Sequence, residues 1–299
     1  MNIKNMASLK GSVVDTQLTT PEIFNDIYYI TEKERPEGKL ADTLIETFEE
    51  VKEYDTSLVE IFKDLLIKNA KKNGYGGNWN DITIWKKFND ILYWWDVLNE
   101  KGEKEIITQK DANYAKKLVD IIKNQMPGKK VINSNCQFQV PIYGTTLING
   151  EEIAIKGLLD ILDVADNKVI ITDLKTTGYS DLEKLIEDRN YLIQASMYYD
   201  LVAQKYPHRK IIFNHLFCQG YKVSLREVIP IDLDRGRDGR TVFSDVSEIN
   251  GIKVISKKYY PGYKSLIELY LSCQKAKLNH FDFNHHYNFG VLPYKSIYE

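Results

Sequence analysis

The stretch GLLDIL at residues 157–162, together with ITDLKTTG at residues 171–178, decides the expected fold. Both stretches lie in short apolar runs that are rich in β-branched residues, and an Asp-Asn pair separates the two runs. Runs of this kind on either side of a tight turn are typical of paired antiparallel strands. The sequence therefore predicts a β-hairpin over residues 153–164 and 168–175.

Three charged residues mark this hairpin. Asp160 lies on the first strand and Asp173 and Lys175 on the second, and residues two apart in a strand share a face. Charges at the edge of a core are costly unless they are paired or bound to a metal. Mg²⁺ prefers oxygen ligands and is commonly held by one or two carboxylates and a substrate phosphate. The residues alone allow two interpretations, a metal–phosphate site and a structural Asp–Lys ion pair.

Further elements are expected on the carboxyl-terminal side of the hairpin. A helix is predicted over residues 181–204 and two strands over 210–219 and 221–231. A Gly- and Arg-rich loop, DRGRDGR at 234–240, and a last helix over 263–277 complete the series. Strands bracketed by helices favour an α/β fold with a mixed central β-sheet flanked by helices.

The first 130 residues carry the 3.6-residue hydrophobic period of helices. We therefore expect a mainly helical part, residues 1–130, packed on an α/β core formed by residues 131–299. Trp94 and Trp95 lie in one of these amphipathic segments and are expected to be buried. The expected helical segments are residues 21–30, 39–54, 57–72, 82–101 and 108–126.

Composition excludes several classes of protein. The chain is 43% hydrophobic and 27% charged, and 40 Lys and Arg against 42 Asp and Glu give a net charge of -2. This balance excludes a disordered chain and a uniformly cationic protein that coats DNA. No apolar run approaches the roughly 18 residues of a membrane span, so no membrane partner is expected. The amino terminus lacks the features of a signal peptide or a presequence, which favours the cytoplasm, or the host cytoplasm for a viral protein.

The order of these pieces resembles the PD-(D/E)XK nuclease superfamily over residues 131–201. Asp160, with Gly157 three residues before it, matches the first metal-binding aspartate of the family. Asp173 and Lys175 match its (D/E)xK signature, and the backbone carbonyl of Leu174 matches a further metal ligand. The resemblance thus implies a restriction-endonuclease-like core with a catalytic site at these residues.

Gln194 and Tyr198 narrow the resemblance to one branch. They are spaced as QxxxY on the expected helix, and residues four apart share a helix face. This motif is similar to that of the exonuclease branch, which includes RecB-type nuclease modules and phage recombination exonucleases. Without the other motifs, the pair is more typical of an ordinary helix surface with a tyrosine anchored in the core.

The resemblance also implies a metal cofactor and a third acidic ligand. The metal is expected to be Mg²⁺, for which Mn²⁺ can substitute. The family takes its third ligand from an upstream helix, as GxxxH or GxxxE, and Gly38 to Asp42 has this spacing with Asp in the last position. Glu46, one turn further along, is the alternative ligand. Both are equally typical of solvated helix residues.

Other metal centres are not expected. Some relatives carry an iron–sulfur cluster on four cysteines, but this chain has only Cys136, Cys218 and Cys273, which are far apart, so no cluster is predicted. These thiols are expected to be reduced and buried. The carboxyl-terminal histidines lack the accompanying ligands of a zinc site; they are His280, His285 and His286.

DNA is the expected partner, and its contacts must be local because the net charge is near zero. Phosphate groups are commonly held by Lys and Arg without reading of sequence. The candidate contacts are Lys71 and Lys72 in one segment and Arg235, Arg237 and Arg240 in another. Each segment is also typical of a solvated surface loop.

The resemblance therefore implies a Mg²⁺-dependent DNA nuclease, in the first place an exonuclease that acts in recombination, repair or phage DNA processing. One alternative is a catalytically inactive nuclease-fold protein that binds DNA or assembles with other proteins. A further alternative is a restriction-type endonuclease. The sequence leaves open whether the chain forms a homo-oligomer or binds a recombination or replication protein.

Overall fold

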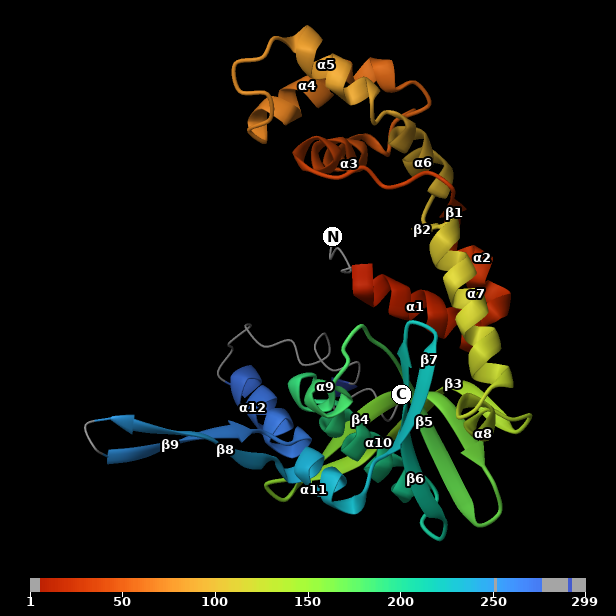
Figure 1. The fold of residues 1–299 in the computed structure, drawn as a ribbon, viewed down its shortest axis with the longest axis vertical. Helices are drawn as coiled ribbons and strands as arrows, with labels where there is room; N and C mark the ends of the chain where they lie inside the picture. Colours follow the sequence, from red (N-terminus) through yellow and green to blue (C-terminus); the bar gives the residue numbers. More distant parts are fainter. Residues whose placement is uncertain (1–5, 250–251, 276–289, 292–299) are drawn as a thin grey trace. The chain divides into compact units, whose positions relative to one another are not determined.

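The protein is a mixed α/β structure (Figure 1). The computed structural model describes residues 6–249, 252–275 and 290–291. The chain divides into two compact units: unit 1 contains Met1–Thr20 and Lys117–Glu299, and unit 2 contains Pro21–Lys116. The boundary expected at residue 130 falls inside unit 1, because the first helix and the residues from Lys117 onward group with the sheet.

Unit 1 is built on a six-stranded sheet with the order β10-β4-β5-β6-β7, in which β3 also pairs with β4. The β5–β6 pair is parallel and the other pairs are antiparallel. The sheet is therefore mixed, as the sequence predicts. Its strands are β3 (Cys136–Ile148), β4 (Glu151–Val164), β5 (Lys168–Thr176), β6 (Lys210–Gln219), β7 (Lys222–Glu227) and β10 (Gly290–Val291).

The predicted hairpin is present as β4 and β5. Its register runs from Val164↔Val169 to Ile161↔Thr172. Further along β4, Ile155 and Lys156 pair with β3 on one edge and with β10 on the other. The neighbour of β4 on this edge therefore changes from β5 to β10 along the strand. Asp160 is the first residue of β4 beyond the recorded pairing of β4 with β5.

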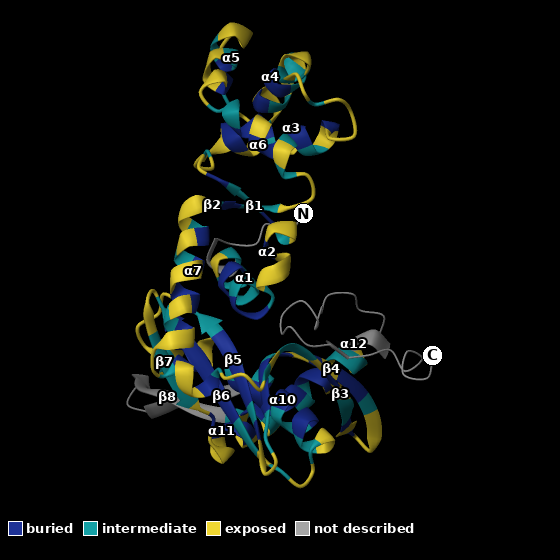
Figure 2. Ribbon diagram, turned by 90° about the vertical axis from the view of Figure 1, so that its right-hand side faces the viewer, coloured by how far each residue is buried: buried dark blue, intermediate teal, exposed yellow. Residues whose placement is uncertain are grey.

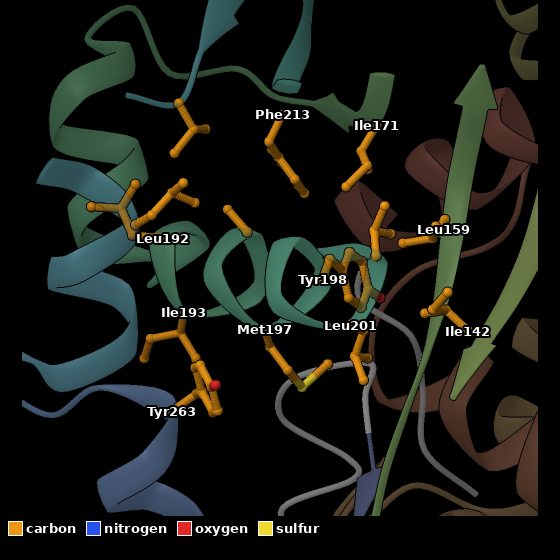
Figure 3. Packing of buried hydrophobic residues seen from close by; sticks show 14 of the residues in the cluster. Ile142, Leu159, Ile171, Leu192, Ile193, Met197, Tyr198, Leu201, Phe213 and Tyr263 are labelled. Atoms are coloured by element: carbon orange, nitrogen blue, oxygen red, sulfur yellow. The ribbon is translucent and has the colours of Figure 1, made fainter. Parts of the chain in front are cut away.

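Helix α10 (Tyr191–Lys205) forms the centre of the main core of unit 1. Its buried residues belong to one core cluster with sheet side chains such as Ile171 and Phe213. In Figure 3, Ile171 and Phe213 lie on one side of the helix, and Ile193, Met197 and Leu201 point to the other side. The expectation of one helix over residues 181–204 was wrong. Asn190 has a left-handed backbone, with φ at 54°, and separates α10 from the short helix α9 (Leu182–Asp188).

Two carboxyl-terminal helices complete this layer. The expected loop over residues 234–240 is largely helix α11 (Pro230–Asp238), so that expectation was wrong. Pro230 begins the helix, where its missing N–H is not needed, and Gly239 ends it with a positive φ. Helix α12 (Tyr263–Lys275) matches the last predicted helix.

Helix α1 (Met6–Thr19) contacts β5 and β4. Gly11 allows the close approach, because a Cβ atom there would lie 2.8 Å from Oγ1 of Thr176. On the amino-terminal side of β3, unit 1 also contains the end of α7 (Gln109–Asn124) and α8 (Gly128–Val131). A separate two-stranded sheet pairs β8 (Arg240–Ile249) with β9 (Ile252–Tyr260).

Unit 2 is mainly helical, with a core centred on Trp95. The Trp95 ring lies 5.0 Å from that of Phe48, and its Nε1 donates a hydrogen bond to the carbonyl of Thr56 at 2.9 Å. The predicted burial of Trp94 and Trp95 is confirmed. The helical elements of unit 2 are η1 (Pro21–Ile23), α2 (Phe24–Ile27), α3 (Lys39–Val51), η2 (Val59–Phe62), α4 (Lys63–Lys72), α5 (Asp81–Asn89), α6 (Tyr93–Lys101) and the first part of α7.

Three helical expectations in unit 2 were wrong. The segment over residues 82–101 forms two helices, α5 and α6, and not one. Residues 28–31 form strand β1 (Tyr28–Thr31), which pairs in parallel with β2 (Glu105–Thr108). The helix expected over residues 57–72 begins only at Lys63, after a 3-10 turn in which Ile61 is exposed, as is Leu58 before it. Figure 2 shows buried residues concentrated along the sheet and α10 in unit 1. Among the described helices, none combines the length and the apolar character needed to cross a membrane.

Candidate active site

The structure brings four of the predicted site residues together in one hydrogen-bonded chain. Nζ of Lys175 donates to Oδ1 of Asp173 at 2.9 Å and to Oε1 of Gln194 at 2.8 Å. Nε2 of Gln194 in turn donates to the hydroxyl of Tyr198 at 3.2 Å. Asp173 and Lys175 come from β5 and the other two from α10, so the helix holds the lysine over the strand.

Asp160 joins this group through the backbone of β5. Its Oδ2 accepts a hydrogen bond from the N–H of Leu174 at 2.8 Å, at the point where the recorded β4–β5 pairing has ended. Burial and the nearby Asp173 charge raise the pKa of Asp160 well above its ordinary value. The structure thus places the amide of Leu174 at the site, and the role of its carbonyl as a metal ligand stays a prediction.

A third carboxylate, Asp15 on α1, was missed in the sequence. Nε2 of Gln139 donates to Oδ2 of Asp15 at 3.0 Å. Burial and the charge of Asp173 raise the pKa of Asp15 to about 6, and Asp15 contributes in turn to the raised pKa of Asp160. The sequence did contain a signal for Asp15, because Gly11 and Asp15 have the same GxxxD spacing as Gly38 and Asp42.

The two acidic residues expected as third ligand belong to the other unit. Asp42 and Glu46 are on α3 in unit 2, where Oε2 of Glu46 accepts a hydrogen bond from Asn73 at 2.9 Å. The carboxylates with the largest effects on the pKa of Asp160 are those of Asp173 and Asp15. The third acid that unit 1 itself supplies is therefore Asp15.

His215 on β6 is the second residue that was missed. It is the register partner of Asp173 across the parallel pair, and its Nδ1 lies 3.0 Å from Oδ2 of that carboxylate. Burial lowers the pKa of His215 despite the opposing attraction of Asp173, so the ring is neutral. No local motif marks His215, because its contact with Asp173 depends on the parallel pairing of two strands that are distant in sequence.

Lys175 and His215 together control the charge of Asp173. Burial alone would raise the pKa of Asp173, but the two partners lower it below its ordinary value. Burial likewise opposes the charge on Lys175, yet Asp173 and Asp160 raise the pKa of its ammonium. The ammonium also lies 4.9 Å from the ring centroid of Tyr191, which is within range of a cation–π interaction. The pair is therefore ionised, with side chains only 2% and 14% exposed.

Gly157 and Tyr198, from two separate motifs, are in contact. A Cβ atom at Gly157 would lie 2.5 Å from Cε1 of Tyr198, so the ring packs directly on the backbone of β4. Burial raises the pKa of Tyr198 to about 12, and its hydroxyl stays protonated. The two motifs thus fix the distance between α10 and β4.

The carboxylates have the oxygen donors that a hard divalent cation prefers, but they are not arranged around a common metal position in the structure. In the described part of the chain, no three His, Cys, Asp or Glu side chains are grouped so as to hold a metal ion. However, the pKa values of Asp15 and Asp160 are raised first by burial and then by the negative charge of Asp173, which Lys175 offsets only in part. Such oxygen donors suit Mg²⁺ or Mn²⁺, which would compete with Lys175 for Asp173.

Most of the cations expected to contact DNA already have acidic partners. Lys71 pairs with Asp81, Arg237 with Asp200 and Asp234, and Arg240 with Glu187, whereas the Arg235–Asp232 distance is 3.9 Å. Lys72 is exposed at the end of α4. DNA contact at these residues stays a prediction. The expected DNA-binding cations in this set are Lys71, Lys72, Arg235, Arg237 and Arg240.

The remaining sequence candidates have separate outcomes. Cys218 is buried, which raises the pKa of its thiol to about 12, whereas Cys136 is only half-buried. His280, His285 and His286 lie outside the described residues.

No family model matches the chain, and no curated protein matches it. Among solved structures, the crystal structure of SSO0001 is similar to 51% of this chain with 17% identity and a TM-score of 0.26. The match spans about half of that structure's length, 55%, and at this score it carries no argument on fold or function.

Proposed function

We propose that this protein is a Mg²⁺-dependent DNA nuclease of the PD-(D/E)XK superfamily, and within it an exonuclease. In this proposal unit 1 is a restriction-endonuclease-like core, with β4, β5 and α10 as its catalytic part. The supporting observation is the chain of contacts from Asp160 through Leu174 and Lys175 to Gln194. It joins three separate sequence motifs at the point where β4 exchanges β5 for β10.

The roles of the residues follow from their contacts and charges. Asp160 and Asp173 would hold the metal, with Asp15 as third acid in place of Asp42 or Glu46. Bound there, Mg²⁺ would polarise the scissile phosphate and make a nearby water more acidic. Lys175 carries a fixed positive charge that can orient the attacking water or offset charge on the phosphate. Gln194 holds Lys175 in place through its Oε1, and Tyr198 fixes Gln194.

Single substitutions test this assignment. Asp173→Ala and Lys175→Ala are expected to abolish Mg²⁺-dependent cleavage while the circular-dichroism spectrum keeps its folded form. Asp15→Asn is expected to reduce the rate by at least about 100-fold, on the scale of a lost group that stabilises the transition state. Asp42→Asn and Glu46→Gln are the matched controls and should cleave at the wild-type rate. Full activity of Asp173→Ala or Lys175→Ala would refute the site.

The form of the DNA substrate decides between the candidate activities. Linear, nicked and closed circular DNA are incubated with the protein and Mg²⁺ or Mn²⁺. Degradation that requires an end supports the exonuclease, whereas discrete fragments from circular DNA would indicate a restriction-type endonuclease. Binding without degradation of any form would indicate an inactive DNA-binding or assembly protein.

A further inference from the structure

His215 is fully buried in β6, and one of its two ring nitrogens has no partner in the part of the chain that the structure describes. Nδ1 lies 3.0 Å from Oδ2 of Asp173, whereas Nε2 is buried and unpaired. Buried polar atoms are nearly always hydrogen-bonded, and one that is not calls for a physical explanation. Nδ1 is the ring nitrogen that has a partner. Its hydrogen bond with Asp173 is therefore the reason why a histidine occupies this buried position.

The surroundings of the ring support this reasoning. The rings of Phe213, Phe217 and Tyr191 lie 5.2, 5.6 and 5.8 Å from that of His215, between centroids. Phe213 points toward α10 in the same core (Figure 3). An aromatic hydrocarbon would fill such a space without leaving a nitrogen unpaired. Packing therefore does not explain the residue, and the hydrogen bond to Asp173 does.

The Asp173 carboxylate is held from two directions. Lys175 lies two residues along the same strand, and His215 lies directly across the parallel register. The lysine has a long and flexible side chain, whereas the histidine is locked among rings in the core. Without His215, the carboxylate would be free to rotate with the ammonium of Lys175, and its oxygens would lose a fixed direction.

We propose that His215 is a positioning residue that orients Asp173 for metal binding by donating a hydrogen bond from Nδ1. This inference rests on the proposed nuclease function, in which Asp173 is a metal ligand. His215 acts through Asp173 and does not itself touch DNA or metal. Groups that hydrogen-bond metal ligands typically change metal affinity by about 10- to 100-fold when they are removed.

Two substitutions separate the hydrogen bond from the packing. His215→Asn keeps an N–H donor close to the position of Nδ1, and His215→Phe keeps an aromatic ring and removes the donor. Mn²⁺ alone is titrated into the full-length protein by calorimetry, without DNA. His215→Phe is expected to weaken Mn²⁺ binding by about 10- to 100-fold, and His215→Asn by less than about threefold. In cleavage assays kcat should fall for His215→Phe while KM for DNA is unchanged.

A measurement on the wild-type protein does not depend on how the variants fold. In ¹⁵N spectra of histidine-labelled protein, His215 should carry its proton on Nδ1, and a proton on Nε2 would overturn the proposal. So would Mn²⁺ binding by His215→Phe at the wild-type affinity, or equal losses in His215→Phe and His215→Asn. If wild-type protein and Asp173→Asn both fail to bind Mn²⁺, the nuclease proposal itself fails, and the role of His215 fails with it.

Discussion

At the scale of single residues, the contact between Gly157 and Tyr198 links the shape of the core to the site. Any side chain at Gly157 would push on the Tyr198 ring, whose hydroxyl accepts the hydrogen bond from Gln194. Overpacking of this kind typically costs about 1–3 kcal/mol. Gly157→Ala should therefore lower the free energy of unfolding by about that amount, measured by urea denaturation.

Gly178 provides the matched control for this prediction. A Cβ atom at Gly178 would meet no atom within 4 Å, and the residue has no positive φ. Gly178→Ala should leave the free energy of unfolding nearly unchanged. Equal destabilisation by the two substitutions would show that the ring contact is not the cause.

Asp15 predicts a pH dependence of stability. Its folded-state pKa of about 6 lies above the ordinary value of 3.8, so the folded protein holds this proton more tightly than the unfolded chain does. Stability should therefore fall as pH rises from about 4 to about 6, by at most about 3 kcal/mol for a shift of this size. Asp15→Asn removes the ionisation, so the variant should be more stable than wild type at pH 7 in the absence of divalent metal.

The sign of this effect is checked with thermal unfolding at pH 4 and pH 7 in EDTA. The gain from Asp15→Asn should be present at pH 7 and largely absent at pH 4. Mg²⁺ should reduce the gain, because a cation beside the carboxylate favours its charged form. A variant that is less stable than wild type at pH 7 would contradict the raised pKa.

At the scale of elements, the ion pairs of α11 distinguish structural from DNA-binding arginines. Arg237 donates to both carboxylate oxygens of Asp200 on α10, and the hydroxyl of Tyr263 on α12 donates to the same group. Arg237→Gln should destabilise the protein by about 1–2 kcal/mol, because it leaves a half-buried carboxylate short of partners. Arg235 is 45% exposed, and Arg235→Gln should leave stability unchanged.

Urea denaturation and DNA-binding titrations on both variants check this division. If Arg237→Gln weakened DNA binding with no loss of stability, the guanidinium would be a DNA contact after all. A loss of DNA affinity only in Arg235→Gln would favour Arg235 as the phosphate contact of this helix.

Elements with local sequence signals could be predicted, whereas an element that depends on packing could not. The β4–β5 hairpin was predicted because its signals are local: two β-branched runs and a turn. Helix α11 was missed because Gly236 and its charged neighbours are typical of a loop. Gly236 is in fact needed for close packing, since a Cβ there would lie 2.0 Å from the carbonyl oxygen of Leu192.

The site shows the same limit. Asp160, Asp173 and Lys175 could be found from their positions in the hairpin, because two short strands carry them. Asp15 and Asp42 both follow a glycine by four residues, and only the packing of α1 on β5 and β4 distinguishes them. His215 needed the parallel register of β5 and β6, which no local pattern specifies.

At the scale of the whole molecule, the charge balance predicts how DNA is held. The net charge is -2, and of the five cations expected to contact DNA, Lys71, Arg237 and Arg240 are paired to acids, which leaves Lys72 and the weakly paired Arg235 as the main candidates for phosphate contacts. Each phosphate contact contributes about -0.9 to the slope of log K against log salt. The slope should therefore be shallow, about -2 to -3, as expected for two or three contacts.

The same balance predicts that DNA binding depends on the bound metal. The Lys175→Met variant keeps the carboxylates, and without the lysine it should not cleave, so its DNA affinity can be measured in Mg²⁺ and in EDTA. Mg²⁺ at the site would offset the repulsion between the carboxylates and the phosphates, and affinity should rise at least about tenfold, or about 1.4 kcal/mol. In the Asp160→Asn/Lys175→Met double variant this gain should disappear. An equal gain in both variants would place the metal effect away from Asp160, and the DNA would then be held by a different part of the molecule.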